Sequence, residues 1–177
     1  MLACALLATA APVQADSPRE LNGSVTDRAA AIGAETPKVQ AAVDRVAKDS
    51  DLSLSVVYVK TFDDTDPQDW ARQTIALSGL GADELLLVIA TEDHRYAVDV
   101  NGESSLSKSD IRAIARKEVR PAVRKDDWAG AAIGAADGYR NADTSSPPYG
   151  AMAGGAVIVL GFVTLLVRSI RRTRART

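Results

Sequence analysis

An uncharged segment of 18 residues near the C-terminus constrains this chain more than any other feature. Residues 150–167 read GAMAGGAVIVLGFVTLLV, a run of small and aliphatic side chains. As a helix rising about 1.5 Å per residue, the segment would extend about 27 Å, close to the hydrocarbon thickness of a bilayer. The sequence therefore predicts one transmembrane helix over residues 150–167, with Tyr149 at its outer interface.

A cluster of arginines directly after this segment predicts the orientation of the span. The tail at residues 168–177 carries Arg168, Arg171, Arg172, Arg174 and Arg176. Positive side chains that flank a span remain on the cytoplasmic side of the membrane. We therefore expect a single-pass plasma-membrane protein with a cytoplasmic basic tail and an extracytoplasmic domain.

The N-terminal residues indicate export, which agrees with that orientation. Residues 1–15 are uncharged and mostly apolar, and they end in Val13-Gln14-Ala15, a pattern that precedes signal-peptidase cleavage. The sequence therefore predicts a signal peptide over residues 1–15, removed before Asp16. The basic residues that usually open a signal peptide are missing, which leaves a start codon further upstream as an open alternative.

Cys4 is the only cysteine and lies inside the predicted signal peptide. The mature chain would then contain no thiol, which excludes thiol catalysis, disulfides and cysteine–zinc sites. A lipoprotein, with Cys4 lipidated at the end of Leu2-Ala3-Cys4, is the alternative. Without disulfides, the domain must be stabilised by its hydrophobic core, which about 125 residues can supply.

The charge of the chain is distributed unevenly. Lysine and arginine number 21, aspartate and glutamate number 23, and the five tail arginines leave 16 basic against 23 acidic side chains elsewhere. The remaining net charge of −7 disfavours phosphate backbones and attracts cations. We therefore expect no nucleic acid among the partners of this protein.

Between its apolar ends the chain alternates helical and strand patterns, which predicts one α/β domain over residues 16–140. A linker over residues 141–149 follows, rich in small polar residues and ending near two prolines. Strands are predicted at residues 52–60, 85–90 and 96–100. Four helices are predicted: one that begins at Thr36-Pro37, one that begins at Asp66-Pro67, one from Ser107 to Arg120 that Pro121 ends, and one over residues 127–139. On the second helix, the side chains expected to face inward are Trp70, Thr74, Ile75 and Leu77.

The apolar run Leu85–Ala90 predicts the architecture, because it is typical of a strand buried on both faces. The helix between residues 60 and 85 makes the first two long strands parallel neighbours through a right-handed crossover. Residues 96–100 should then pair back antiparallel. The predicted fold is a three-layer α/β/α sandwich with a small mixed sheet.

Five stretches of the domain resemble the TPM domain family, which includes thylakoid luminal phosphatase-like and photosystem II repair proteins. The stretches are Val25–Asp27, Val57–Trp70, Leu80–Ala90, Asp93–Val98 and Trp128–Ala132, in the family's order. The chain looks most like the actinobacterial, membrane-anchored branch. The resemblance implies an α/β/α sandwich, with phosphatase activity or divalent-cation binding in some members. The plant-type Asp-Asn-Gly pattern reads Ala82-Asp83-Glu84 here, so Asp83 alone carries over.

Acidic residues follow the two predicted parallel strands, where ligands of open α/β sheets bind. Asp63 and Asp64 follow the first strand, and Glu92 and Asp93 follow the second. If the strands are neighbours, these carboxylates form a candidate site for Ca²⁺ or Mg²⁺, with Asp83 added by the resemblance. Structural roles compete with this hypothesis: Asp66 as a helix cap, and Asp27 and Asp83 as caps of the elements they precede.

Two functions remain open from the sequence. The first is a non-catalytic accessory or interaction domain of the cell envelope. It would bind another envelope protein, with or without a divalent cation at the contact. The alternative is a weak metal-assisted phosphatase that uses Asp63, Asp64 and Asp83. His94 is the only histidine and no Gly-x-Ser-x-Gly motif occurs, so no serine hydrolase triad is predicted.

Overall fold

The computed structural model describes residues 16–102 and 104–145. Its strands are β1 (Val25–Asp27), β2 (Ser53–Val59), β3 (Glu84–Ala90) and β4 (Arg95–Val100). Its α-helices are α1 (Thr36–Asp49), α2 (Pro67–Ser78), α3 (Lys108–Ile114), α4 (Arg120–Val123) and α5 (Trp128–Ser145). A 3₁₀ turn at Gly33–Glu35 precedes α1, and a π-helical turn at Ala115–Val119 joins α3 to α4.

The four strands form one mixed sheet in the order β1-β2-β3-β4. β2 pairs in parallel with both β1 and β3, and β4 pairs antiparallel to β3. The predicted parallel pair and the predicted antiparallel return are therefore confirmed. β1 was not predicted, because three half-buried residues are too few to show a strand period.

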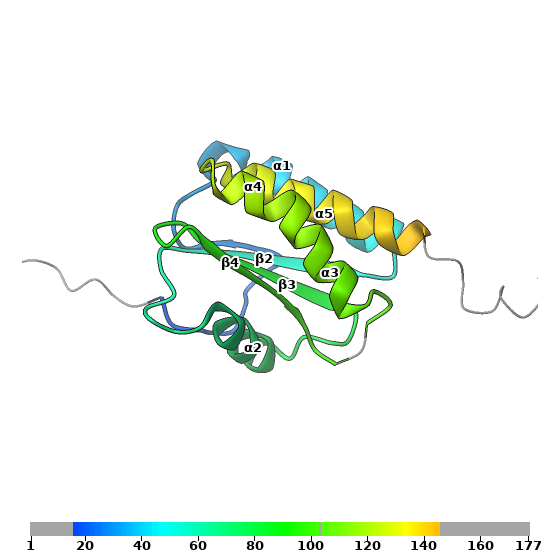
Figure 1. Cartoon of the computed structure of the whole chain (residues 1–177), viewed down its shortest axis with the longest axis horizontal. Helices are drawn as coiled ribbons and strands as arrows, with labels where there is room; N and C mark the ends of the chain where they lie inside the picture. The colour runs from blue at the N-terminus through cyan, green and yellow to red at the C-terminus, as the bar shows by residue number, and fades with distance from the viewer. Residues whose placement is uncertain (1–15, 103, 146–177) are drawn as a thin grey trace, which may run out of the picture. The chain divides into compact units, whose positions relative to one another are not determined.

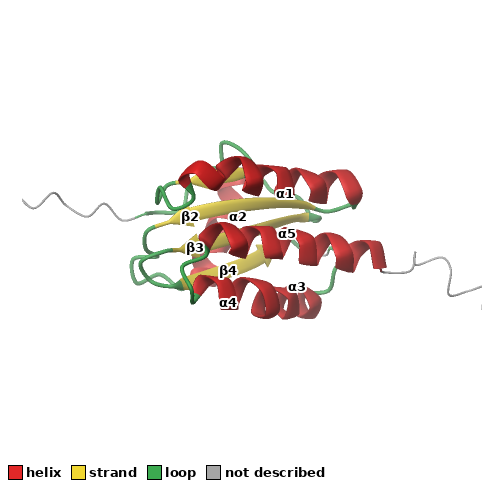
Figure 2. Cartoon of the chain, turned by 90° about the horizontal axis from the view of Figure 1, so that it is seen from above, coloured by secondary structure: helices red, strands yellow, loops and turns green. Residues whose placement is uncertain are grey.

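Helices cover both faces of the sheet. Figure 1 shows α2 on one face, with α1, α3, α4 and α5 on the other. Seen from above that second face, α1, α5 and the α3–α4 run lie side by side over the strands (Figure 2). β3 supplies both layers of the core: Leu85, Leu87 and Ile89 pack under the larger helical layer, and Leu86, Val88 and Ala90 face α2.

Helix starts agree with the sequence at two positions and differ at a third. The Asp66 carboxylate accepts hydrogen bonds from the Gln68 and Asp69 amides at the start of α2, and the Ser107 hydroxyl caps α3. Thr36, by contrast, is already helical, because the 3₁₀ turn carries the chain into α1. Its hydroxyl donates to the Gly33 carbonyl at 2.7 Å and does not cap the helix.

Pro121 does not stop the third predicted helix, which is a second correction. A proline removes one helical N–H donor, and its ring clashes with the carbonyl four residues earlier. The π-helical turn widens the backbone just before it, and the Arg120 amide bonds the Ala115 carbonyl five residues back. α4 then begins with Pro121 in its first turn, so the helical run continues to Val123.

Two further details of the helices differ from the expectation. Leu77 was placed on the inner side of α2, but its side chain is 56% exposed, because Trp70, Thr74 and Ile75 already fill that face. α5 continues to Ser145, five residues beyond the predicted domain end at 140. The predicted span at 150–167 lies outside the described residues, and within them no helix has the length and hydropathy of a membrane span.

Small side chains on α5 allow close packing against the α3–α4 run. Ala131, Ala132 and Ala135 are buried against the sheet, as the sequence predicted. A Cβ atom on Gly138 would meet Cγ2 of Ile114 at 2.5 Å, and one on Gly134 would lie 3.2 Å from Cβ of Glu118. An added methyl group would therefore clash more severely at Gly138 than at Gly134.

We expect Gly138→Ala to lower the free energy of unfolding by about 1–2 kcal/mol, because the clash with Ile114 outweighs the gain in helix propensity. Gly134→Ala is the matched control on the same helix, and its milder contact should leave the stability nearly unchanged. Urea unfolding of both variants measures the difference. Equal stability of the two variants would contradict the packing argument.

Candidate functional site at the carboxyl edge

The carboxyl ends of the parallel strands β1, β2 and β3 meet at one edge of the sheet, which we call the carboxyl edge. It comprises the loops at residues 28–32, 60–66, 91–94 and 124–127. The last of these loops precedes α5 and joins the others through contacts. Nε2 of His94 lies 2.8 Å from Oδ1 of Asp126, and the Tyr58 hydroxyl donates to the Trp128 carbonyl at 3.1 Å.

Left-handed backbone conformations are concentrated at this edge. Within the described residues, all the non-glycine residues with positive φ lie in these loops: Ala30, Asp63, Asp64, His94 and Asp126, with φ between 47° and 58°. Aspartate and histidine tolerate this left-handed conformation better than other side chains, whereas at Ala30 it is strained and must be imposed by the surrounding contacts. Such strain is typical of binding and catalytic loops.

Asp93 connects two of the loops and has a structural role. Its Oδ2 atom accepts hydrogen bonds from the Thr61 hydroxyl at 3.1 Å and from the Phe62 amide at 2.8 Å. These bonds join the loop after β2 to the turn after β3. Half of the carboxylate is therefore already engaged.

The carboxylates of Asp63, Asp64 and Glu92 are exposed at the same edge. In the described part of the chain none of these three carboxylates accepts a hydrogen bond or forms an ion pair. Sequence reasoning thus placed Asp63, Asp64, Glu92 and Asp93 correctly on neighbouring loops. Nevertheless, residues 16–102 and 104–145 contain no preformed group of three or more His, Cys, Asp or Glu side chains able to hold a metal.

Asp83 lies at the opposite end of the sheet, which corrects its assignment to the same site. It precedes β3, and its Oδ1 accepts hydrogen bonds from the Ser104 hydroxyl at 3.2 Å and the Ser105 amide at 3.0 Å. The seven residues of β3 separate it from Glu92 and Asp93 by about 20 Å, at ~3.3 Å per residue. Asp63, Asp64 and Asp83 therefore cannot act together on one small substrate.

Asp27 is the last residue of β1 and therefore lies at the carboxyl edge. The sequence predicted it only as a cap of the element that follows. Its carboxylate accepts hydrogen bonds from the Ala31 amide at 3.0 Å and the Ile32 amide at 3.1 Å. These bonds cap the turn that leads to α1. Asp27 therefore stabilises this turn but does not cap the 3₁₀ segment or α1, neither of which has a side-chain cap.

Tyr58 is buried below these carboxylates. Burial raises the pKa of its phenol well above the ordinary value, and the nearby carboxylates of Asp27, Asp127 and Glu35 raise the pKa further. A neutral phenol is therefore strongly favoured in the folded state. Its hydroxyl donates a hydrogen bond to the Trp128 carbonyl and anchors the start of α5 to the sheet.

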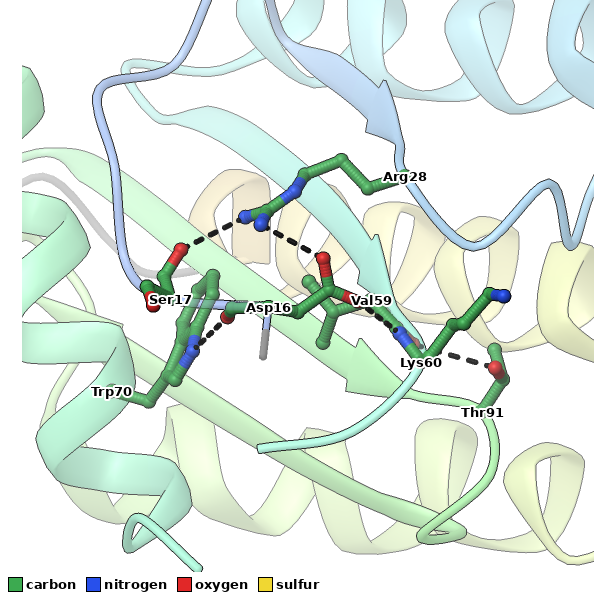
Figure 3. Close-up of polar contacts among 7 residues, drawn as sticks. All are labelled: Asp16, Ser17, Arg28, Val59, Lys60, Trp70 and Thr91. Carbon is green, nitrogen blue, oxygen red and sulfur yellow. Dashed lines mark hydrogen bonds and ion pairs between the residues drawn. The ribbon is translucent and has the colours of Figure 1, made fainter. Parts of the chain in front are cut away.

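Asp16 connects the N-terminal strap, residues 16–22, to this edge (Figure 3). Its Oδ1 lies 2.8 Å from the guanidinium of Arg28, and its Oδ2 accepts the Lys60 amide at 2.8 Å. Its carbonyl accepts the indole N–H of Trp70, also at 2.8 Å. Burial lowers the pKa of Arg28, and the Asp16 carboxylate opposes that change. No local sequence signal indicates Asp16, because its partners lie 12 to 54 residues away.

The Asp16 contacts predict a large effect of one substitution. We expect Asp16→Ala to lower the free energy of unfolding by about 1–3 kcal/mol, because Arg28 loses its partner and the Lys60 amide loses its acceptor. Glu35→Ala removes an exposed ion pair with Lys38 and should cost less than about 0.5 kcal/mol. Urea denaturation compares the two, and a loss no larger in Asp16→Ala than in Glu35→Ala would refute the assignment.

The buried phenol predicts a dependence of stability on alkaline pH. Since the folded pKa of Tyr58 is raised, its contribution is complete below the unfolded value of about 10 and is lost as pH rises towards the folded pKa. Between pH 10.5 and 11.5 the Tyr58→Phe variant should therefore lose less stability than the wild type, by about 1.4 kcal/mol per pH unit. Identical slopes in urea unfolding would contradict this.

Comparisons with known proteins agree on one family. The family model of the TPM domain matches residues 25–142. Two UPF0603 proteins of Mycobacterium tuberculosis, MT2410 and Rv2345, are 34% identical over 136 residues, which cover 76% of this chain and 21% of each relative. The chain thus spans about a fifth of the length of these relatives.

Solved structures show the same fold. The N-terminal domain of the cg2496 protein from Corynebacterium glutamicum is 28% identical, with a TM-score of 0.61 over 77% of this chain and 90% of that domain. An N-terminal domain from P. gingivalis is 20% identical, with a TM-score of 0.58 over 68% and 82% of the two chains. At that identity the second likeness supports the fold alone.

Proposed function

Because the chain belongs to the TPM domain family, we propose that it is an extracytoplasmic, membrane-anchored interaction domain of the cell envelope. In this proposal the carboxyl edge contacts another envelope protein, and Ca²⁺ or Mg²⁺ contributes to that contact. The observation that carries the proposal is the coincidence of strained loops and unpaired carboxylates at one edge. The exposed carboxylates are hydrated in the free protein and accessible to a cation or a basic partner, and strained backbone such as that at Ala30 is typical of binding loops.

The position of the carboxylates supports binding in preference to catalysis. The residue that the family resemblance singles out, Asp83, is committed to the loop at 104–105 and lies far from Asp63 and Asp64. The carboxyl edge therefore presents an acidic surface. The residues of the phosphatase alternative, by contrast, lie at opposite ends of the sheet, with Asp63 and Asp64 at one end and Asp83 at the other. An acidic surface of this kind recognises a cation or a basic patch on a protein.

A divalent cation fits the donor chemistry of the edge, but only as a weak ligand. Asp63, Asp64 and Glu92 present the carboxylate oxygens that hard cations prefer. Because the described residues form no complete metal cluster, water or partner side chains would supply the remaining ligands. We therefore propose millimolar binding, which the partner strengthens.

The proposed anchoring is supported by sequence features outside the described residues. These are the signal-like residues 1–15, the uncharged segment 150–167 and the five tail arginines. Protease added to intact cells should digest the domain and spare a short C-terminal fragment. A domain that remains intact in such cells, yet is digested after lysis, would refute the extracytoplasmic location.

Calorimetry of the full chain in a mild detergent tests the cation site. We expect Ca²⁺ or Mg²⁺ to bind at millimolar concentration, and Asp63→Asn with Asp64→Asn to weaken binding about tenfold, because two anionic ligands are lost. Asparagine keeps the backbone conformation, because it also tolerates positive φ. Glu20→Gln with Asp51→Asn removes the same charge elsewhere and serves as the control.

The outcomes separate the alternatives. Equal weakening in both double variants would show that the cation responds only to net charge, and no binding would remove the cation from the proposal.

An aryl phosphate assay of the same proteins examines the second function. Hydrolysis by the wild type that the Asp63→Asn, Asp64→Asn variant loses would favour the metal-assisted phosphatase.

A further inference from the structure

An open pocket of about 460 Å³ lies beside the start of β4. Its walls come from three elements: the start of α2 with Pro67 and Gln68, the start of β4 with Arg95 and Tyr96, and α4 with the following residue Arg124. Arg120 and Val123 complete the α4 side, and Asp66 and His94 border the pocket towards the carboxyl edge. The pocket plays no part in the cation site proposed above.

Three arginines line this pocket without a partner. Arg95, Arg120 and Arg124 are exposed, and in the described part of the chain no side chain forms an ion pair or a hydrogen bond with their guanidinium groups. Arg28 and Arg72, by contrast, each pair with an aspartate. Three unpaired cations around one pocket are unexpected in a chain whose charge outside the tail is −7.

The arginines on the helical run repel one another. Arg112, Arg116, Arg120 and Arg124 follow at intervals of four residues, a spacing at which like charges destabilise a helix. Only Arg120 and Arg124 of these four line the pocket. Arg112 instead borders a separate, smaller hollow with Val98 and Val100. An anion in the pocket would relieve the repulsion between Arg120 and Arg124.

Tyr96, whose side chain carries a hydroxyl group, also lines the pocket. Its side chain is half-buried, and burial raises the pKa of the phenol, whereas the positive charges of Arg120 and Arg116 lower it. These opposing effects place the phenol within the field of Arg120. In the described residues the hydroxyl has no hydrogen-bond partner, so it can donate to a ligand.

We propose that this pocket binds the phosphate group of a ligand. The three arginines and Asp66 sum to a charge of +2, which matches the −1.5 to −2 of a phosphomonoester better than the −1 of a carboxylate. Guanidinium groups bind phosphate oxygens in a bidentate manner, and the Tyr96 hydroxyl donates a further hydrogen bond. The volume exceeds that of phosphate alone, which leaves room for the group that carries it. The inference concerns binding, without hydrolysis.

Titration of the full chain in a non-ionic detergent with phosphoserine tests the proposal. We expect binding, and we expect Arg120→Gln and Arg124→Gln each to weaken it about tenfold, because each removes a bidentate contact. Arg112→Gln is the matched control, since it removes the same charge from the same helical run outside the pocket. It should change the affinity less than twofold, and circular dichroism verifies that each variant is folded.

A second arm distinguishes a soluble phosphate from a lipid headgroup. The wild type, Arg120→Gln and Arg112→Gln proteins are each reconstituted in nanodiscs of phosphatidylcholine alone. Each is then mixed with vesicles of phosphatidylcholine and phosphatidic acid, and the protein that sediments with the vesicles is measured. Binding to phosphoserine identifies a soluble ligand, and retention by the acidic vesicles alone identifies a headgroup, provided that Arg120→Gln abolishes it. The proposal is overturned if neither probe binds, or if Arg112→Gln weakens binding as much as Arg120→Gln.

Discussion

The parallel pairing of β2 with β3 determines where every candidate site of this domain lies. The register from Ser53↔Glu84 to Val59↔Ala90 places the ends of both strands at one edge, and β1 extends the same arrangement. Because both faces of β3 are buried, a slip by one residue would exchange its side chains between two differently packed core layers. The loops that carry the acidic residues are therefore attached to the ends of the buried central strands.

Patterns that depend on neighbouring residues were predicted well. The buried run of β3, the return strand β4 and the caps at Asp66 and Ser107 follow from local periodicity and side-chain chemistry. The π-helical turn was missed, because Pro121 alone indicates a helix end and only the packing of this segment beside α5 and on the sheet shows otherwise. β1 and Asp16 were missed for a related reason, since both depend on partners distant in sequence.

The candidate sites show the same limit. Proximity of Asp63 to Asp93 followed from the order of the strands, whereas the separation of Asp83 required knowledge of which end of β3 it occupies. The four-residue repeat of arginines is visible in the sequence. That two of them line one pocket with Arg95 and Tyr96 depends on how the α3–α4 run lies over β4, which no local pattern specifies.

The N-terminal strap has a consequence for how the edges of this domain are defined. Similarity to the family begins at Val25, yet Asp16 holds Arg28 and Trp70, and Leu21 packs on the α2 side of the core. A recombinant fragment that begins at Val25 would expose the Trp70 indole and would leave the half-buried Arg28 without its ion-pair partner. Poor solubility of such a fragment would then result from the missing N-terminal strap, and not from low stability of the complete domain.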